Sequence, residues 1–148
     1  MNLSEPALRQ QAVEAAVEVL NTMFFELPVQ RPEDCESPRP EDLCALATFT
    51  GTAEGSFAVA LETRSLNRLS ASFLGAEEDE ITAGLGSNVL CELTNMLCGA
   101  TLSRLDPDSH IVISSPKVAA SSEVSPSPWV RFPLECGSLA ISLTYRGL

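Results

Sequence analysis

A carboxylate and a carboxamide lie three positions apart in the apolar-rich segment between residues 88 and 99. Positions three, four and seven apart share one face of an α-helix, so Asn88, Glu92, Asn95 and Gly99 form one stripe. Apolar residues lie around the opposite side: Val89, Leu90, Leu93, Met96, Leu97 and Ala100. The sequence therefore presents Glu92 and Asn95 together, one turn apart, with Gly99 removing bulk where another surface could approach. Many polar stripes only face water, so the surrounding elements decide what the pair does.

Composition and charge limit the class of protein and its partners. The chain has 148 residues, 45 % apolar and 20 % charged, which suits one globular domain over residues 1–148. Its net charge of −11 argues against nucleic acid and against an anionic membrane surface, since both attract basic proteins. No apolar run approaches the roughly 20 residues of a membrane span, and the first residues lack an export pattern. We therefore expect a cytoplasmic protein.

Five cysteines and one histidine form no recognisable metal or nucleophile pattern. An odd number of cysteines without an export signal, and without a Cys-x-x-Cys pair, indicates reduced thiols. Cys91 and Cys98, on the flank of the helix, are expected to be small apolar fillers. His110 alone cannot build a multi-histidine site, so no metal site is predicted.

Apolar spacing predicts a chain of helices and hairpins around that segment. We expect residues 1–5 to be disordered, with Ser4 as the N-cap of the first helix. Residues 28–42 are rich in proline and acid and should form a surface connector with short extended pieces at most. The expected elements are helices over 6–26, 63–74 and 78–104, a hairpin over 43–62, a strand over 110–116, a loop over 124–128 and a terminal hairpin over 129–145.

Hairpins at both ends of this order imply antiparallel pairing. The predicted fold class is therefore α+β, a two-layer domain whose antiparallel sheet is covered on one face by helices. The acidic stretch of residues 77–80 is expected at the start of the long helix, where the helix dipole favours negative charge. Thr94 is expected on the surface of that helix, and Trp129 in core or dimer packing.

From about residue 10 to the end, this layout resembles the CheX branch of the CheC/CheX/FliY phosphatase family of bacterial chemotaxis. The strongest part of the resemblance is Leu-Gly-Ala-Glu-Glu-Asp-Glu over residues 74–80, then Glu-Leu-Thr-Asn-Met-Leu-Cys-Gly over 92–99, then Ser115-Pro116. The chain has one copy of the Glu/Asn motif, as CheX-like proteins have. Two flanking positions depart from the family pattern: Asn88 replaces a serine or aspartate, and Pro116 comes a couple of residues early.

The resemblance implies an enzyme that removes phosphate from the aspartyl phosphate of a CheY-like response-regulator receiver. Such a receiver holds its own Mg²⁺ and lysine, so the chain is expected to need no cofactor of its own. Asn95 would orient the attacking water, as a glutamine does in small GTPases. Glu92 would anchor the receiver through its active-site lysine, while Asn88 and Gly99 would border the contact.

Two alternatives remain open from the sequence. One is a non-catalytic module of the same fold that binds a receiver or a flagellar-switch partner. The other is an unrelated hydrolase with a cysteine or serine nucleophile, for which no triad or nucleophile elbow is visible; a thiol-blocking reagent should inactivate only this last kind of enzyme.

The resemblance also implies a homodimer joined through sheet edges. The terminal hairpin and the strand over 45–50 are the candidate edges, because an unpaired edge tends to seek a partner.

Overall fold

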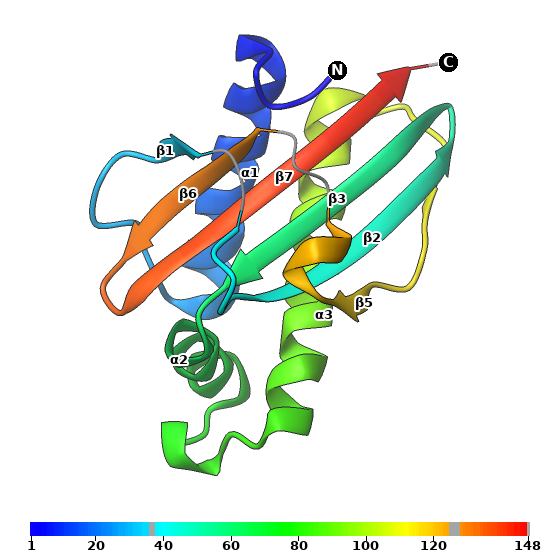
Figure 1. Cartoon of the computed structure of the whole chain (residues 1–148). Helices are drawn as coiled ribbons and strands as arrows, with labels where there is room; N and C mark the ends of the chain where they lie inside the picture. The colour runs from blue at the N-terminus through cyan, green and yellow to red at the C-terminus, as the bar shows by residue number, and fades with distance from the viewer. Residues whose placement is uncertain (36–37, 125–127, 148) are drawn as a thin grey trace.

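Seven antiparallel strands form one sheet in this computed structural model, which describes residues 1–35, 38–124 and 128–147 (Figure 1). The strands are β1 (Glu33–Cys35), β2 (Leu43–Gly51), β3 (Ala53–Leu61), β4 (Ile111–Ile113), β5 (Lys117–Ala119), β6 (Trp129–Leu134) and β7 (Gly137–Gly147). The α-helices are α1 (Pro6–Phe24), α2 (Thr63–Leu74) and α3 (Ala83–Leu105), and two 3₁₀ turns are η1 (Glu78–Glu80) and η2 (Ser121–Glu123). Most of these elements lie where the sequence predicts them, and α2 has the predicted bounds.

The strand order is β1-β6-β7-β3-β2-β4, and β5 pairs with β2 beside β4. The strand over 45–50 is therefore not an edge, because β4 and β5 cover it. The terminal hairpin is not a free edge either, since β7 lies inside the sheet and β1 pairs with residues 129–131 of β6. Both edges proposed for a dimer are thus wrong, and the homodimer itself stays a prediction.

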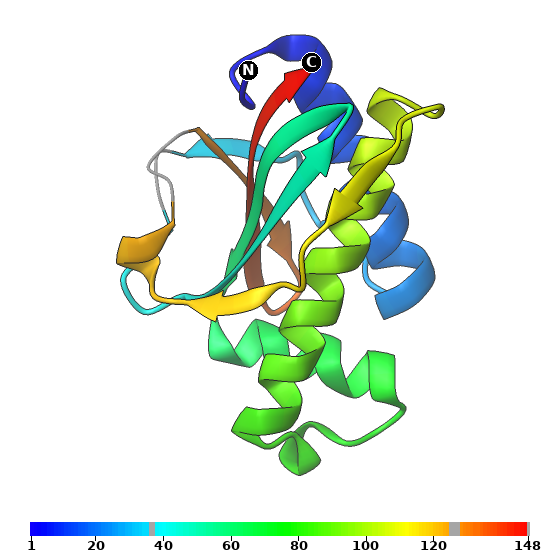
Figure 2. The same cartoon turned by 90° about the vertical axis from the view of Figure 1, so that its right-hand side faces the viewer.

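The two faces of the sheet are covered differently (Figure 2). Ala45 and Phe49 of β2 point to the helices and join the main core with residues of all three helices. The opposite face carries a smaller cluster around Trp129, which is fully buried. This arrangement confirms the predicted two-layer α+β domain with helices on one face, and it assigns Trp129 to core packing.

A tight turn joins β2 to β3, with only Thr52 between the strands. The two glycines of residues 51–55 are typical of a longer turn, but Ala53 to Gly55 already pair with β7. Gly51 has a φ of 134°, and a Cβ there would lie 2.0 Å from the His110 carbonyl oxygen. Only glycine allows this close approach.

The first residues are not disordered, contrary to expectation. Asn2 forms a β-bridge with Thr144, the Met1 amine donates to the Tyr145 carbonyl at 2.9 Å, and Leu3 is buried. Ser4 does not cap α1: the N-cap is Glu5, without a side-chain hydrogen bond, and Pro6 occupies the first turn.

The proline-rich connector contributes β1 to the sheet, so short extended pieces are indeed present there. Its residues 36–37 lie outside the described residues, as do 125–127 of the loop expected over 124–128. None of the helices that the structure describes is long and apolar enough to cross a membrane.

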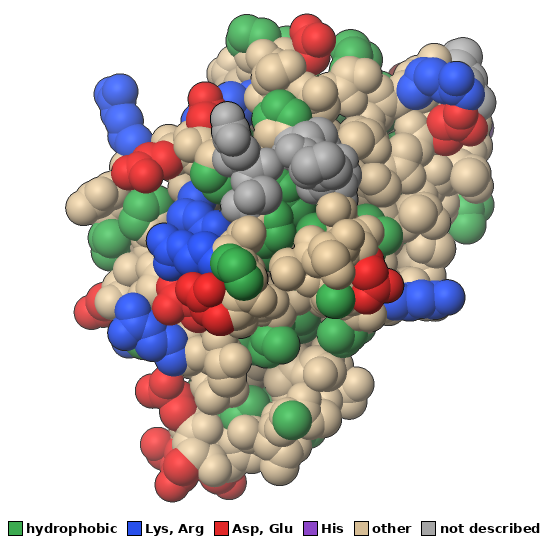
Figure 3. All heavy atoms as spheres, in the orientation of Figure 1, with side chains coloured by type: hydrophobic (Ala, Val, Ile, Leu, Met, Phe, Trp, Pro, Cys, Tyr) green, Lys and Arg blue, Asp and Glu red, His purple; other side chains and the backbone are tan. Residues whose placement is uncertain are grey.

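The acidic residues 77–80 do not begin the long helix. They form the separate turn η1, in which the Glu77 amide donates to the Glu80 carboxylate at 2.9 Å, and α3 begins only at Ala83. Figure 3 shows acidic side chains at the lower end of the molecule, the end formed by the segment between α2 and α3.

Candidate functional site

Helix α3 carries the predicted pair and is fixed on several sides. Its N-cap is Thr82, whose hydroxyl accepts from the Leu85 amide at 3.2 Å, and it ends before Asp106. It packs against α1, α2 and the strands β2 to β5, so most of its circumference is buried. Thr94, expected on the surface, is fully buried, and its hydroxyl donates to the Leu90 carbonyl at 2.8 Å. Between residues 86 and 102, the exposed part of α3 is therefore a narrow strip, not half of the helix.

Asn88, Glu92 and Asn95 lie on this strip and are all exposed. None of the three side chains has a hydrogen bond or ion pair with a residue that the structure describes. A carboxylate and two carboxamides are thus free to bind something outside the chain. Their separation of three or four residues gives them fixed relative positions, because the helix beneath them is packed into the core.

These side chains form one wall of a shallow groove, which has a volume of about 360 Å³. The other wall comes from the segment that links β4 to β5. The lining residues are Asn88, Cys91, Glu92, Asn95, Ile113, Ser114, Ser115 and Pro116. In Figure 2 this segment runs beside α3 at the edge of the sheet. A partner docked on the strip would therefore also contact residues 113–116.

Sequence reasoning missed most of the second wall. It predicted one strand over 110–116, whereas the structure has β4, a three-residue link and then β5. The signal available in the sequence was Ser-Ser-Pro between two short apolar segments, since proline interrupts a strand or marks an irregular edge. Ser115-Pro116 entered the family resemblance as the end of that predicted strand, whereas the structure places them in the link between two strands.

Gly99 lies one turn beyond the groove and is half-buried. A Cβ built on Gly99 would meet only Ile113 Cδ1, at 3.9 Å, which is an ordinary contact. Packing inside the chain therefore does not require glycine at this position.

Cys91 lines the groove, although the sequence indicated only a filler on the flank of the helix. Burial raises the pKa of its thiol, and the Val118 backbone opposes this in part. The thiol is therefore protonated at neutral pH, which makes it a poor nucleophile. A thiol-blocking reagent would nevertheless fill the groove, so the reagent no longer distinguishes a cysteine hydrolase from a CheX-like enzyme.

A metal or triad site finds no support in the part of the chain that the structure describes. No group of three or more His, Cys, Asp or Glu side chains there could hold a metal ion. His110 is exposed, and its backbone, not its ring, bonds to Thr52.

A family model described as "Chemotaxis phosphatase CheX" matches residues 43–132, which include β2 to β5, α2, α3 and the whole groove. The chain belongs to the CheX family. No curated protein matches it significantly.

Solved structures of CheX proteins share the fold. The crystal structure of CheX from Desulfovibrio desulfuricans is 21 % identical, with a TM-score of 0.75, and the match covers 95 % of this chain and 99 % of that one. The CheX–CheY–BeF₃–Mg²⁺ complex from Borrelia burgdorferi gives 17 % identity and a TM-score of 0.73, covering 94 % and 97 %. FliY from Thermotoga maritima is more distant, at 15 % identity and a TM-score of 0.62, covering 93 % and 85 %.

Proposed function

We propose that this CheX-family chain removes phosphate from the aspartyl phosphate of a CheY-like response-regulator receiver. The observation that carries the proposal is the exposed, unbonded pair Glu92 and Asn95, held one turn apart in a groove at the surface. The family description, and the complex of the Borrelia CheX with CheY, support a receiver as the partner. The pair is accessible to another protein, as such a reaction requires.

Asn95 is the catalytic residue in this proposal. An acyl phosphate is already activated, so its hydrolysis depends mainly on placing a water in line and stabilising the spread charge. A carboxamide can accept from the water and donate to the phosphoryl group, and it keeps both abilities at any pH. The receiver supplies Mg²⁺ and a lysine, and this chain supplies no cofactor.

Glu92 anchors the receiver by pairing with the active-site lysine. The pair sets the register between the two proteins, and the helix then places Asn95 one turn away at the phosphoryl group. Asn88 borders the contact inside the groove, and Gly99 borders it one turn farther along α3.

A second candidate function is receiver or switch-protein binding without turnover. It rests on the fold that this chain shares with the FliM middle domain from Vibrio alginolyticus, at 12 % identity and a TM-score of 0.58. The exposed pair fits this function less well, because binding alone gives Asn95 no specific task.

The test is phosphate release from a panel of phosphorylated CheY-type receivers, with wild type and Asn95→Ala side by side. We expect the wild type to accelerate release from at least one receiver. Asn95→Ala should lose about 100-fold or more of the acceleration, the scale of one lost transition-state contact, and should still bind the receiver. Equal acceleration by both proteins would disprove the assignment of Asn95, and stoichiometric binding without phosphate release would establish the second candidate.

A further inference from the structure

The second wall of the groove is an irregularity in the edge of the sheet. β4 pairs with residues 49–51 of β2, and β5 pairs with residues 44–46 of the same strand. Between these ladders, two residues of β2 (47–48) lie opposite three residues of the edge (114–116). One extra residue on one strand is a β-bulge, a feature that redirects side chains and is common beside active sites.

A serine side chain holds this bulge in place. The Thr48 amide donates to Ser114 Oγ at 2.9 Å, and the Thr48 hydroxyl donates to the same oxygen at 3.0 Å. The Ser114 amide donates to the Thr48 carbonyl at 2.8 Å. Ser114 Oγ thus takes the place of a ladder carbonyl, and Pro116, which has no amide hydrogen, cannot continue the ladder.

The bulge leaves Ser115 exposed at the rim between the groove and a second hollow, with no side-chain partner among the described residues. Ser115 is exposed and lines the groove opposite the Asn88–Asn95 strip, and its hydroxyl has no hydrogen bond to a described residue. A serine hydroxyl can donate one hydrogen bond and accept two. It is the one side-chain hydroxyl of this wall that is available to a docked protein, because Ser114 Oγ is already engaged by Thr48.

We infer that residues 114–116 are a recognition element for the receiver, in which Ser115 contacts the docked protein and Ser114 is a positioning residue. The inference rests on the proposed function, and it adds a second set of contacts to those of α3. The bulge acts on binding and not on the attacking water, because in the proposed function Asn95, on the opposite wall, orients the water. Loosening the bulge should therefore raise KM and leave kcat nearly unchanged.

The chain offers a matched control for the Ser114 hydrogen bonds. On β3 and β7, the Ser56 amide donates to Thr144 Oγ1 at 3.2 Å, and the two hydroxyls lie 2.9 Å apart. This is the same arrangement of a strand amide and two hydroxyls, and neither residue lines the groove. Thr144→Val removes the accepting hydroxyl and nearly keeps its shape, as Ser114→Ala does at the bulge.

The experiment measures the affinity for CheY-type receivers activated with beryllofluoride and Mg²⁺, together with kcat and KM for phosphate release. Ser114→Ala and Ser115→Ala should each weaken affinity and raise KM by roughly fivefold, the scale of one hydrogen bond, with kcat within about twofold of wild type. Ser114→Thr, which keeps the hydroxyl, should restore the affinity. Thr144→Val should lower the melting temperature about as much as Ser114→Ala and leave binding unchanged.

Equal loss of affinity in Ser114→Ala and Thr144→Val would overturn the inference, because it would show a general effect on the fold. Unchanged affinity in Ser115→Ala would overturn it as well. Failure of the proposed function is seen separately, in the wild type. If the wild type binds a receiver without releasing phosphate, the catalytic proposal is wrong but the affinity test of the bulge remains valid. If the wild type binds no receiver, both the proposed function and the inference about the bulge are wrong.

Discussion

Two hollows of similar size lie on either side of the bulge, and only one has the features of a site. The groove beside α3 measures about 360 Å³, and the second hollow, on the helix-free side of β5, measures about 320 Å³. They share Ser114 and Ser115. The second hollow is completed by Leu46, Thr48, Lys117, Val118, Ala119 and Glu123. Volume therefore does not separate them, and the difference must lie in the chemistry of the walls.

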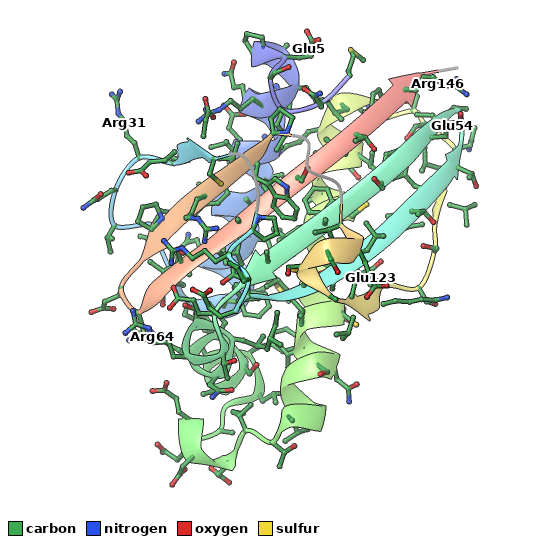
Figure 4. All side chains as sticks on the ribbon, in the orientation of Figure 1. Glu5, Arg31, Glu54, Arg64, Glu123 and Arg146 are labelled. Carbon is green, nitrogen blue, oxygen red and sulfur yellow. The ribbon has the colours of Figure 1, made fainter. Side chains whose placement is uncertain are left out.

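Each hollow has a carboxylate, but only one carboxylate is available. Glu123, labelled on η2 in Figure 4, accepts from the Ala120 amide at 2.8 Å and so stabilises its own turn. Glu54 and Arg146 at the far end of the sheet are likewise paired with each other (Figure 4). Glu92 has no such partner among the described residues. A rigid helix presents it beside Asn95, whereas the charged groups of the second hollow come from two short elements.

The largest difference between the hollows should appear when each loses its carboxylate. Glu92→Ala should weaken receiver binding by about 10- to 100-fold, because a charge-assisted hydrogen bond to the receiver lysine is lost. The matched variant, Glu123→Ala, should leave binding within about twofold. Titration of a beryllofluoride-activated receiver by calorimetry measures both affinities. Equal effects of the two substitutions would mean that the receiver does not distinguish the hollows.

Chemical modification of Cys91 in the groove should cause the next largest effect, a loss of activity. An adduct on Cys91 would fill the space that the receiver needs and should lower activity by about tenfold or more, while Cys91→Ala should stay within about twofold of wild type. Because burial raises the pKa of this thiol, the reaction with N-ethylmaleimide should accelerate with pH, by about tenfold per unit below that pKa. Cys35 and Cys136 are also half-buried free thiols that the reagent could modify. The control is therefore Cys91→Ala treated with the same reagent, which should stay active. Inactivation of this variant would locate the effect outside the groove.

A smaller effect is expected at the end of the strip. Gly99→Leu should weaken binding by roughly fivefold, because a branched side chain would stand where the receiver approaches. Gly99→Ala should bind normally and raise the free energy of unfolding by about 0.5–1 kcal/mol, since glycine inside a helix is less favourable than alanine. Denaturant unfolding and receiver affinity are measured for both Gly99 variants. Normal binding by Gly99→Leu would place the receiver contact on the Asn88–Asn95 part of the strip alone.

The contrast between the two walls of the groove also explains what the sequence could predict. Glu92 and Asn95 are local: helical spacing alone places them on one face, and their exposure agrees with that prediction. The wall at Ser114 depends on pairing with Thr48, sixty-six positions away, and no local pattern encodes such a register. β5 was missed for a related reason. Its three residues are too few to show an alternation of apolar and polar side chains.

The same contrast between local and long-range determinants explains which parts of the fold were predicted. Long periodic segments gave α2 and both hairpins nearly as predicted, whereas Thr94 was misplaced because the prediction assumed that only one side of α3 is buried. Packing against helices as well as strands also buries the side of that helix that carries Thr94, and only the tertiary structure shows this. The acidic residues 77–80 were misplaced because they form a separate turn, closed by the hydrogen bond from the Glu77 amide to the Glu80 carboxylate, instead of the first turn of α3.

The smallest effect tests where the docking surface ends. Lys117 is the only lysine of the chain; it is exposed in the second hollow and has no ion pair with a described residue. Its Cα partner in the ladder is Leu46, so its side chain points to the helix-free side of the sheet, away from Asn95. Lys117→Ala should therefore change receiver affinity by less than about twofold at low salt, where an exposed charge has its greatest effect. A clear loss of affinity that disappears at high salt would show that the receiver reaches across the bulge, and the two hollows would then be parts of one interface.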